Sequence, residues 1–576
     1  ASDVYKRQVG SGMDAIIPLF QQHAIDHFIA DKTMQGVGGW LALYILVMII
    51  QTATNYISAY GACKAELYIG RDLKRETFNH LQTLSFSYFN QNSVGYTHAR
   101  VMSDTDRIAS TLAWGLMEAV WYIAYLLLAI VMMFVLNWKL ALCVMVIVPV
   151  LVISGAYFQK KLVFFHRRVR EQNSKITGAF NEGITGAKTT KTLVIEDKVE
   201  QEFDDLTGEM KRLSVRAMHF RSVFMSTTAF AASIALAIVL WRGGVITRDG
   251  VILIGTLSVF MNYAQGMMEP VQWLVQVMSS LVNVQVNVER VTRLLETESD
   301  VSDTPEVTAK YGDAFHPKKE NWEPLYGDIE FQDVTFRYPD GSENVLEHFN
   351  LKVPQGTNVA IVGETGAGKS TLVNLVCRFF EPTQGRILID GRDARERSQL
   401  WLHSNIGYVL QTPHLFSGTV LENLRYGRPD ATMDEIEAAV KTVSADQIIA
   451  RLPDGYNTDI GEGGNTLSTG EKQLLSFARA LLADPRIFVL DEATSSVDTV
   501  TERLIEDAIE KVMAGRTSFI IAHRLSTIRH ADVILVVHDG KIIESGTHRS
   551  LMNAKGAYYQ LYTHQYREEQ TRSMMD

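Results

Sequence analysis

The segment Gly363–Thr371 has the residue types and the spacing that bind a chain of phosphates. It reads G-E-T-G-A-G-K-S-T, fits the pattern G-x-x-x-x-G-K-S and follows the apolar run Val359–Val362. Glycines let backbone N–H groups curl around an anion, and a helix N-terminus adds positive potential. In this pattern the lysine reaches the β- and γ-phosphates and the serine hydroxyl coordinates Mg²⁺. We therefore expect ATP and Mg²⁺ to bind here, on Gly363, Glu364, Thr365, Gly366, Ala367, Gly368, Lys369, Ser370 and Thr371, with Ser370 as a metal ligand.

Two acidic residues follow a second apolar run, Ile487–Leu490. Four apolar residues predict a buried strand, so Asp491 and Glu492 would emerge at its end. Asp491 would hold Mg²⁺, and Glu492 would orient and polarise the attacking water. The alternative is a surface turn that happens to carry two acids.

The segment Leu467–Gln473 (L-S-T-G-E-K-Q) lies between these two motifs and resembles the signature motif of ABC transporters. With the motifs in this order, the second half resembles their ATPase domain, and the chain from about residue 10 to 565 resembles a bacterial half-size ABC exporter of the multidrug or lipid type. The resemblance implies a polytopic α-helical membrane domain with six spans, the first truncated, fused to an α/β P-loop ATPase domain. The implied boundaries are 9–296 for the membrane domain, 297–327 for a linker and 328–566 for the ATPase domain.

The resemblance also implies roles for single residues. Tyr338 would stack on adenine, Gln411 would contact Mg²⁺ and water, and His523 would contact the γ-phosphate. Ser468 and the N–H of Gly470 would bind the γ-phosphate of an ATP held by a second chain. Glu492, His523 and Gln411 are thus the expected catalytic residues, and Ser370, Gln411 and Asp491 the expected metal ligands. The same resemblance matches Ser495–Asp498 to the D-loop, and Phe86–Gly95 and Glu182–Lys191 to the coupling helices.

The signature motif departs from the family pattern at three positions, Thr469, Glu471 and Lys472. Glu471 places an acid near an incoming triphosphate, which should weaken that site. An intact Glu492 beside an altered signature resembles one partner of the heterodimers in this family. The predicted partner is therefore a second, different half-transporter, and a homodimer remains the alternative.

Uncharged apolar runs crowd into the first half of the chain. A membrane-spanning helix needs about 20 mostly apolar residues, and the runs are 37–63, 119–137, 140–159, 223–241 and 251–268, with a fragment at 15–20. Residues 1–8 look foreign to the fold, and the fragment looks like the end of a clipped first span. The long connectors around 64–118 and 160–222 are rich in Lys and Arg, which predicts that they lie in the cytoplasm.

Glu269 stands beside Pro270, where the last run is expected to end near its inner side. Ionisable groups near spans are costly, so the residue is a candidate site. It would either face a cavity and meet a cationic substrate, or bond to a neighbouring helix.

Composition narrows the class of function. The 576 residues are 47% hydrophobic, with 55 Lys and Arg against 65 Asp and Glu, which argues against a nucleic-acid partner. Three scattered cysteines argue against a disulfide framework or a zinc site. We expect a multi-pass plasma-membrane protein with a cytoplasmic ATPase domain that exports a hydrophobic or amphipathic drug, lipid or peptide. An ATP-gated channel or regulator is the alternative, although an intact Glu492 and His523 favour turnover.

Overall fold

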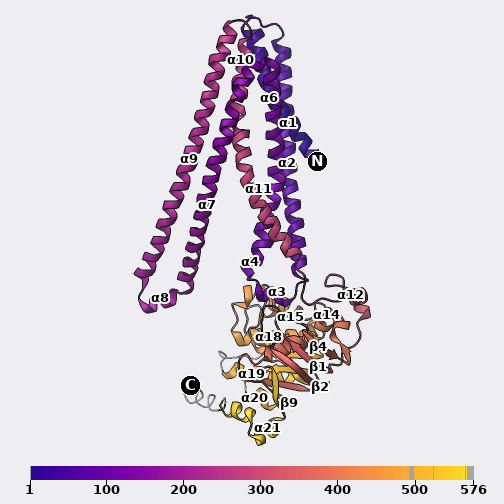
Figure 1. Cartoon of the computed structure of the whole chain (residues 1–576). Helices are drawn as coiled ribbons and strands as arrows, with labels where there is room; N and C mark the ends of the chain where they lie inside the picture. The colour runs from indigo at the N-terminus through magenta and orange to yellow at the C-terminus, as the bar shows by residue number, and fades with distance from the viewer. Residues whose placement is uncertain (1, 492–498, 523–524, 565, 567–576) are drawn as a thin grey trace. The chain divides into compact units, whose positions relative to one another are not determined.

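The computed structural model describes residues 2–491, 499–522, 525–564 and 566, which form two compact units (Figure 1). The first unit comprises Ala1–Asn79 and Gly95–Glu296. The second comprises His80–Val94 and Thr297–Asp576. Three expected parts of the site lie outside the described residues: Glu492, His523 and the D-loop segment 495–498.

The first unit is helical. Its main helices are α1 (Ser2–His23), α2 (Val37–Leu81), α6 (Leu116–Met145), α7 (Ile147–Thr185), α8 (Ala187–Leu193), α9 (Glu196–Arg248), α10 (Ile254–Gly266) and α11 (Met268–Leu295). The segment between α2 and α6 contains α4 (Val94–His98) and α5 (Thr105–Ser110) with π-helical turns. Helices α7 and α9 run side by side and are joined by α8 (Figure 1). Helix α1 packs against α6 and α10, around the fully buried Met133, Leu140, Phe260 and Tyr263.

Among the described residues, three helical stretches are long and apolar enough to cross a membrane: Val37–Leu81, Val94–Thr185 and Glu196–Arg248. They contain four of the five predicted runs. The helix breaks between the runs 119–137 and 140–159, because Asn137 leaves the helical conformation (φ −161°, ψ 105°) inside α6. Its side-chain oxygen accepts the N–H of Leu140 at 3.1 Å and so caps the helix that follows.

The fifth run does not end where the sequence suggested. Helix α10 stops at Gly266, and α11 begins at Met268 and continues through Glu269 and Pro270 to Leu295. A proline is tolerated in the first turn of a helix, where its missing N–H would have no partner in the helix. Glu269 therefore lies in the first turn of a long helix.

The segment 297–327 packs into the second unit. It contains α12 (Pro305–Tyr311), whose N-cap Thr304 accepts the N–H of Val307. Val307, Tyr311 and Leu325 are buried in the same core as the sheets. The segment expected as a surface linker thus contributes to the hydrophobic core of the unit that follows it.

The second unit holds two sheets. The larger has the order β10-β9-β3-β8-β7-β6 and is parallel except for β10, and the smaller, antiparallel sheet has the order β2-β1-β4-β5. The strands are β1 (Ile329–Phe336), β2 (Leu346–Val353), β3 (Asn358–Val362), β4 (Gln384–Ile389), β5 (Arg392–Asp393), β6 (Ile406–Val409), β7 (Ile487–Asp491), β8 (Thr517–Ile521), β9 (Val533–His538) and β10 (Lys541–Gly546). The helices include α3 (Phe86–Gln91), α13 (Lys369–Val376), α14 (Gln399–Ser404), α15 (Val420–Arg425), α16 (Met433–Thr442), α17 (Asp446–Ile449), α18 (Thr469–Leu482), α19 (Thr499–Met513), α20 (Leu525–Arg529) and α21 (His548–Ala554).

Strand β3 is buried on both faces, which is typical of a parallel sheet covered by helices. Its residues alternate between two cores: Ala360 and Val362 belong to one, and Val359 and Ile361 to the other. The helical first unit and the α/β second unit confirm the predicted fold class.

Candidate ATP-binding site

The phosphate-binding loop joins the central strand β3 to α13. Gly366 and Gly368 adopt φ values of 86° and 99°, in the left-handed region that favours glycine. At Gly363 an added Cβ would collide with the backbone oxygen of Val537, so the close approach of two strands requires glycine there. The loop therefore has the backbone that an anion-binding turn needs, and it opens onto the N-terminus of a helix.

Lys369 folds back over this loop. Its Nζ donates to the backbone oxygens of Gly363 and Glu364, both at 2.8 Å, and the residue is 8% exposed. Burial lowers the pKa of Lys369, and the negative charge of Asp491 opposes that shift. The ammonium group is thus held at the loop by carbonyl oxygens, which bind it more weakly than phosphate oxygens would.

The sheet order brings the metal-binding candidates to one edge. The loop after β3, Asp491 at the end of β7 and Gln411 two residues beyond β6 all follow parallel strands of one sheet. Strand β8 lies between β3 and β7 and ends at Ile521, two residues before His523. The carboxyl edge of a parallel sheet is where such folds bind ligands. Ser370 and Asp491 supply the hard oxygen ligands that Mg²⁺ prefers, so the donor set fits this ion.

Tyr338 lies next to the phosphate-binding loop. Its hydroxyl is 2.9 Å from the Thr371 Oγ1, so the ring bridges the end of β1 and the start of α13. Edge-to-face contacts with Phe336 and Phe380, at 4.9 Å and 5.1 Å between ring centroids, fix its orientation. A residue 33 positions before Thr371 is thereby brought beside the phosphate-binding loop.

The signature segment forms the N-terminus of α18. Ser468 is the N-cap, and its Oγ accepts the N–H of Glu471 at 3.3 Å. The Glu471 carboxylate accepts the N–H of Ser468 at 2.8 Å and its hydroxyl at 2.9 Å, which completes a capping box. Gly470 is buried in the first turn. The acid expected near a triphosphate therefore already accepts both the N–H and the hydroxyl of Ser468, and the S-x-x-E spacing was the signal for it in the sequence.

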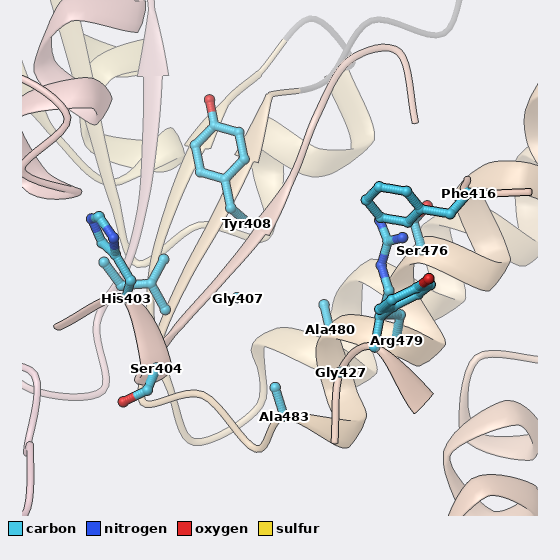
Figure 2. Close-up of a pocket in the computed structure, with 12 residues that line it drawn as sticks. His403, Ser404, Gly407, Tyr408, Phe416, Gly427, Ser476, Arg479, Ala480 and Ala483 are labelled. Carbon is cyan, nitrogen blue, oxygen red and sulfur yellow. The ribbon is translucent and has the colours of Figure 1, made fainter. Parts of the chain in front are cut away.

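A cavity of about 410 Å³ lies beside the strand that leads to Gln411 (Figure 2). His403, Gly407 and Tyr408 line it from the sheet side, and Arg479 lines it from α18. Gln411 itself is exposed and is not among the lining residues.

In the first unit, Glu269 accepts a hydrogen bond from the hydroxyl of Tyr122 at 3.0 Å. Three other carboxylates of this unit accept indole N–H groups in the same way: Trp121 to Asp14 at 2.9 Å, Trp114 to Glu66 at 2.8 Å and Trp273 to Glu118 at 2.9 Å. The Tyr122 ring contacts two tryptophan rings. Its centroid is 4.7 Å from that of Trp121 and 5.0 Å from that of Trp273. Of these residues, the sequence had singled out Glu269 alone.

Comparison with known proteins agrees with this geometry. Residues 8–271 match the family model described as the ABC transporter transmembrane region, and residues 346–495 match the one described as ABC transporter. An uncharacterized ABC transporter ATP-binding protein of Bacillus subtilis (strain 168) is 35% identical over 94% of this chain and 88% of its own length. An ATP-dependent lipid A-core flippase of Desulfotalea psychrophila is 36% identical over 86% of this chain and 84% of its own length.

A solved structure of a bacterial Atm1-family ABC exporter with ATP bound matches the model with a TM-score of 0.80 and 25% identity, over 98% of this chain and 97% of that one. A putative multidrug export ATP-binding/permease protein of B. subtilis is 33% identical over 95% of this chain and 93% of its own length. With both family regions in one chain, this protein belongs to the ABC transporters as a half-size exporter, a multi-pass membrane protein whose transport is driven by ATP hydrolysis in a fused cytoplasmic ATPase domain.

Proposed function

We propose that this chain hydrolyses ATP with Mg²⁺ at the carboxyl edge of its six-stranded sheet and thereby drives a hydrophobic or amphipathic compound outward. The observation that carries this is the convergence of the phosphate-binding loop, Asp491 and Gln411 at the ends of strands in one parallel sheet. Lys369 would exchange its two backbone oxygens for the β- and γ-phosphates. Ser370 and Asp491 would hold Mg²⁺, which neutralises phosphate charge.

Two further roles in this proposal fall on residues outside the described part of the chain. Glu492 follows Asp491 directly and would orient and polarise the attacking water. His523 would contact the γ-phosphate, and Gln411 would contact the metal and the water. Tyr338 would stack on adenine, which its contact with Thr371 supports.

We also propose that the chain works as one half of a heterodimer. In such a dimer the partner's ATP would bring its γ-phosphate to Ser468 and Gly470. The carboxylate of Glu471 already accepts bonds there, so two anions would compete for one helix N-terminus. The site made with this signature would be slow, and the site made by this chain's own loop and Glu492 would be fast.

The exposed tip of the α7–α9 pair, formed by α8, is a surface on which a second chain could dock. Helix α8 buries none of its residues within the chain. Its last residue, Leu193, is 61% exposed, and the following Val194 is 81% exposed. Apolar side chains at the end of a long helical pair are costly in water, and a partner's surface would cover them.

For the transported compound, the carboxylates bonded to Trp and Tyr in the membrane unit favour an amphipathic cation. Aromatic faces attract organic cations, and a carboxylate in a medium of low dielectric constant attracts them further. Tyr122, Trp273 and Glu269 combine both features in one connected group.

The experiment is transport into inside-out vesicles that contain the chain together with the product of the neighbouring gene, if that gene encodes a second half-transporter. We expect ATP-dependent uptake of a lipophilic fluorescent cation, no uptake with a non-hydrolysable ATP analogue, and weaker uptake of an anion of equal size. Glu269→Gln should reduce uptake of the cation while ATPase activity in its absence is retained. Flux that starts on ATP binding and continues without hydrolysis would favour the ATP-gated channel instead.

A further inference from the structure

A second cavity, of about 300 Å³, lies in the ATPase unit beside Tyr338. One wall consists of Tyr338–Gly341 and Phe380, and the other is α3, which contributes Ser87, Asn90 and Gln91. An aromatic floor with amide side chains opposite suits a planar ring that carries hydrogen-bonding groups on its edge. The volume is at the lower end of the range for sites that bind small molecules.

Tyr338 connects this cavity to the phosphate-binding loop. Its hydroxyl end is 2.9 Å from the Thr371 Oγ1 at the start of α13, while the residue also lines the cavity. A nucleotide with its phosphates on the loop and its base on the Tyr338 ring therefore brings the edge of the base toward α3.

Helix α3 is fixed against this part of the unit by an aromatic contact. The rings of Phe86 and Phe379 are 4.2 Å apart, and Phe379 immediately precedes the cavity residue Phe380. A hydrogen bond of 3.0 Å between the His80 Nε2 and the backbone oxygen of Thr297 ties the start of the same segment to the unit. Helix α3, which carries Asn90 and Gln91, is thus fixed in position by these two contacts.

The side-chain amide of Gln91 uses its NH₂ group in a hydrogen bond within α3. Its Nε2 donates to the Ser87 Oγ at 3.3 Å, so the carbonyl Oε1 is left to accept a hydrogen bond. Adenine presents a 6-amino donor on its edge, whereas hypoxanthine and guanine present a carbonyl acceptor there. Glutamine and asparagine are the side chains that pair with the edge of adenine in nucleic-acid recognition.

We propose that α3 completes a base-recognition subsite, in which Ser87 orients Gln91 and the Gln91 carbonyl accepts the 6-amino group of an adenine stacked on Tyr338. The subsite makes the chain prefer ATP to inosine triphosphate. It rests on the proposed binding of ATP to the phosphate loop. It also places the base of the nucleotide in direct contact with the segment that enters the unit from α2.

The test is equilibrium binding of ATP and of inosine triphosphate, each with Mg²⁺, to the full-length Glu492→Gln protein in lipid nanodiscs. One hydrogen bond of this kind corresponds to about a two- to tenfold change in affinity. We expect Gln91→Ala to reduce the preference for ATP by about that factor, through weaker ATP binding. Ser87→Ala should reduce it in the same direction, because the amide would then be free to turn.

Gln82→Ala, an exposed amide of the same segment that does not line the cavity, is the matched control and should leave the preference unchanged. Tyr338→Ala should weaken both nucleotides alike. If both nucleotides bind and Gln91→Ala leaves their ratio at the wild-type value, the subsite is wrong while the ATPase proposal stands. If neither nucleotide binds to the unsubstituted loop, the proposed function itself fails.

Discussion

At the residue scale, two groups expected to bind phosphate are already hydrogen-bonded to oxygens of the chain itself. Lys369 is held by the backbone oxygens of Gly363 and Glu364, and Ser468 is held by Glu471. In both cases the group expected to contact phosphate already has a partner within the chain. Binding must therefore exchange one hydrogen bond for another, and the charge of the phosphate decides the exchange.

Lys369→Ala should weaken ATP binding itself, because the loop loses the cation that faces the β- and γ-phosphates. Glu492→Gln should leave binding intact and stop hydrolysis, because the attacking water loses its base. Binding of a fluorescent ATP analogue and release of phosphate, measured on the assembled dimer, separate the two effects. Hydrolysis by Glu492→Gln at near the wild-type rate would show that another residue polarises the water.

Glu471 is predicted to make the two ATP sites of the dimer unequal. The double change Thr469→Gly with Glu471→Gln should alter total ATPase activity little if the partner lacks its catalytic acid. A glutamine can still complete the capping box, so α18 should remain folded. The measurement is ATPase activity of the chain alone and of the chain purified with the product of its neighbouring gene. Robust activity of a stable homodimer with two equivalent sites would contradict the heterodimer.

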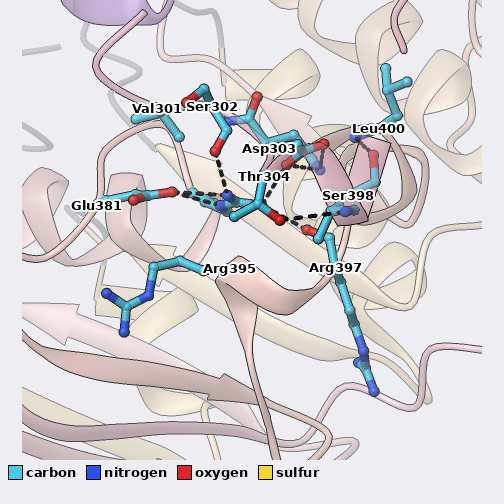
Figure 3. A network of polar contacts seen from close by, with 12 residues as sticks. Val301, Ser302, Asp303, Thr304, Glu381, Arg395, Arg397, Ser398 and Leu400 are labelled. Atoms are coloured by element: carbon cyan, nitrogen blue, oxygen red, sulfur yellow. Dashed lines mark hydrogen bonds and ion pairs between the residues drawn. The ribbon is translucent and has the colours of Figure 1, made fainter. Parts of the chain in front are cut away.

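At the element scale, the end of α13 is tied to the segment that precedes the ATPase sheets (Figure 3). Arg378 has a side chain that is 3% exposed and donates to the Asp303 Oδ1 at 2.9 Å, to the backbone oxygen of Arg397 at 2.7 Å and to the Glu381 Oε1. Asp303 in turn accepts the N–H of Gln399, which starts α14. The turn that follows α13 is therefore held by an ion pair between the buried Arg378 and Asp303 of segment 297–327.

Arg378→Met should destabilise the ATPase unit by up to about 3–5 kcal/mol, because it leaves two half-buried carboxylates, Asp303 and Glu381, without their cation. The double change Arg378→Met with Asp303→Leu should recover part of the loss, since it removes one of the two carboxylates that the single change leaves without a cation. The measurement is the melting temperature of the full-length protein in detergent. Arg395→Met, which removes a partly exposed pair with Asp393, is the control and should shift it less. Equal shifts for both single changes would contradict the role of the buried pair.

At the scale of the whole molecule, the basic charge of the long connectors predicts which segments lie inside the cell. The residues between α3 and α4 would lie with the cytoplasmic connectors, and the turn between α9 and α10 would lie outside. Ser93 and Asp249 are exposed at these two places.

In a chain whose three cysteines have been replaced, a cysteine at Ser93 should react with a membrane-impermeant reagent only from the inside. A cysteine at Asp249 should react only from the outside. The native residues to remove are Cys63, Cys143 and Cys377, of which Cys63 is exposed. Labelling of intact cells and of inside-out vesicles distinguishes the two sides, and the reverse pattern would overturn the assigned topology.

Elements whose function depends on a few consecutive residues could be predicted from the sequence alone. The phosphate-binding loop, the strand before Asp491 and the cap at Ser468 are each a few consecutive residues, and their chemistry depends on backbone turns that neighbouring residues dictate. Four of the five apolar runs likewise predicted helices able to cross a membrane, because twenty apolar residues suffice for that property.

Tertiary structure decided the contacts between distant residues. Tyr338 contacts Thr371, 33 residues further along the chain, and Asp303 pairs with Arg378, 75 residues further along. Phe86 packs on Phe379, several hundred residues away. Burial of Val307 and Tyr311, and the continuation of the last helices past Pro270, also depended on neighbours absent from the local sequence. Such contacts follow from sheet order and from the packing of apolar faces, which no short window of residues contains.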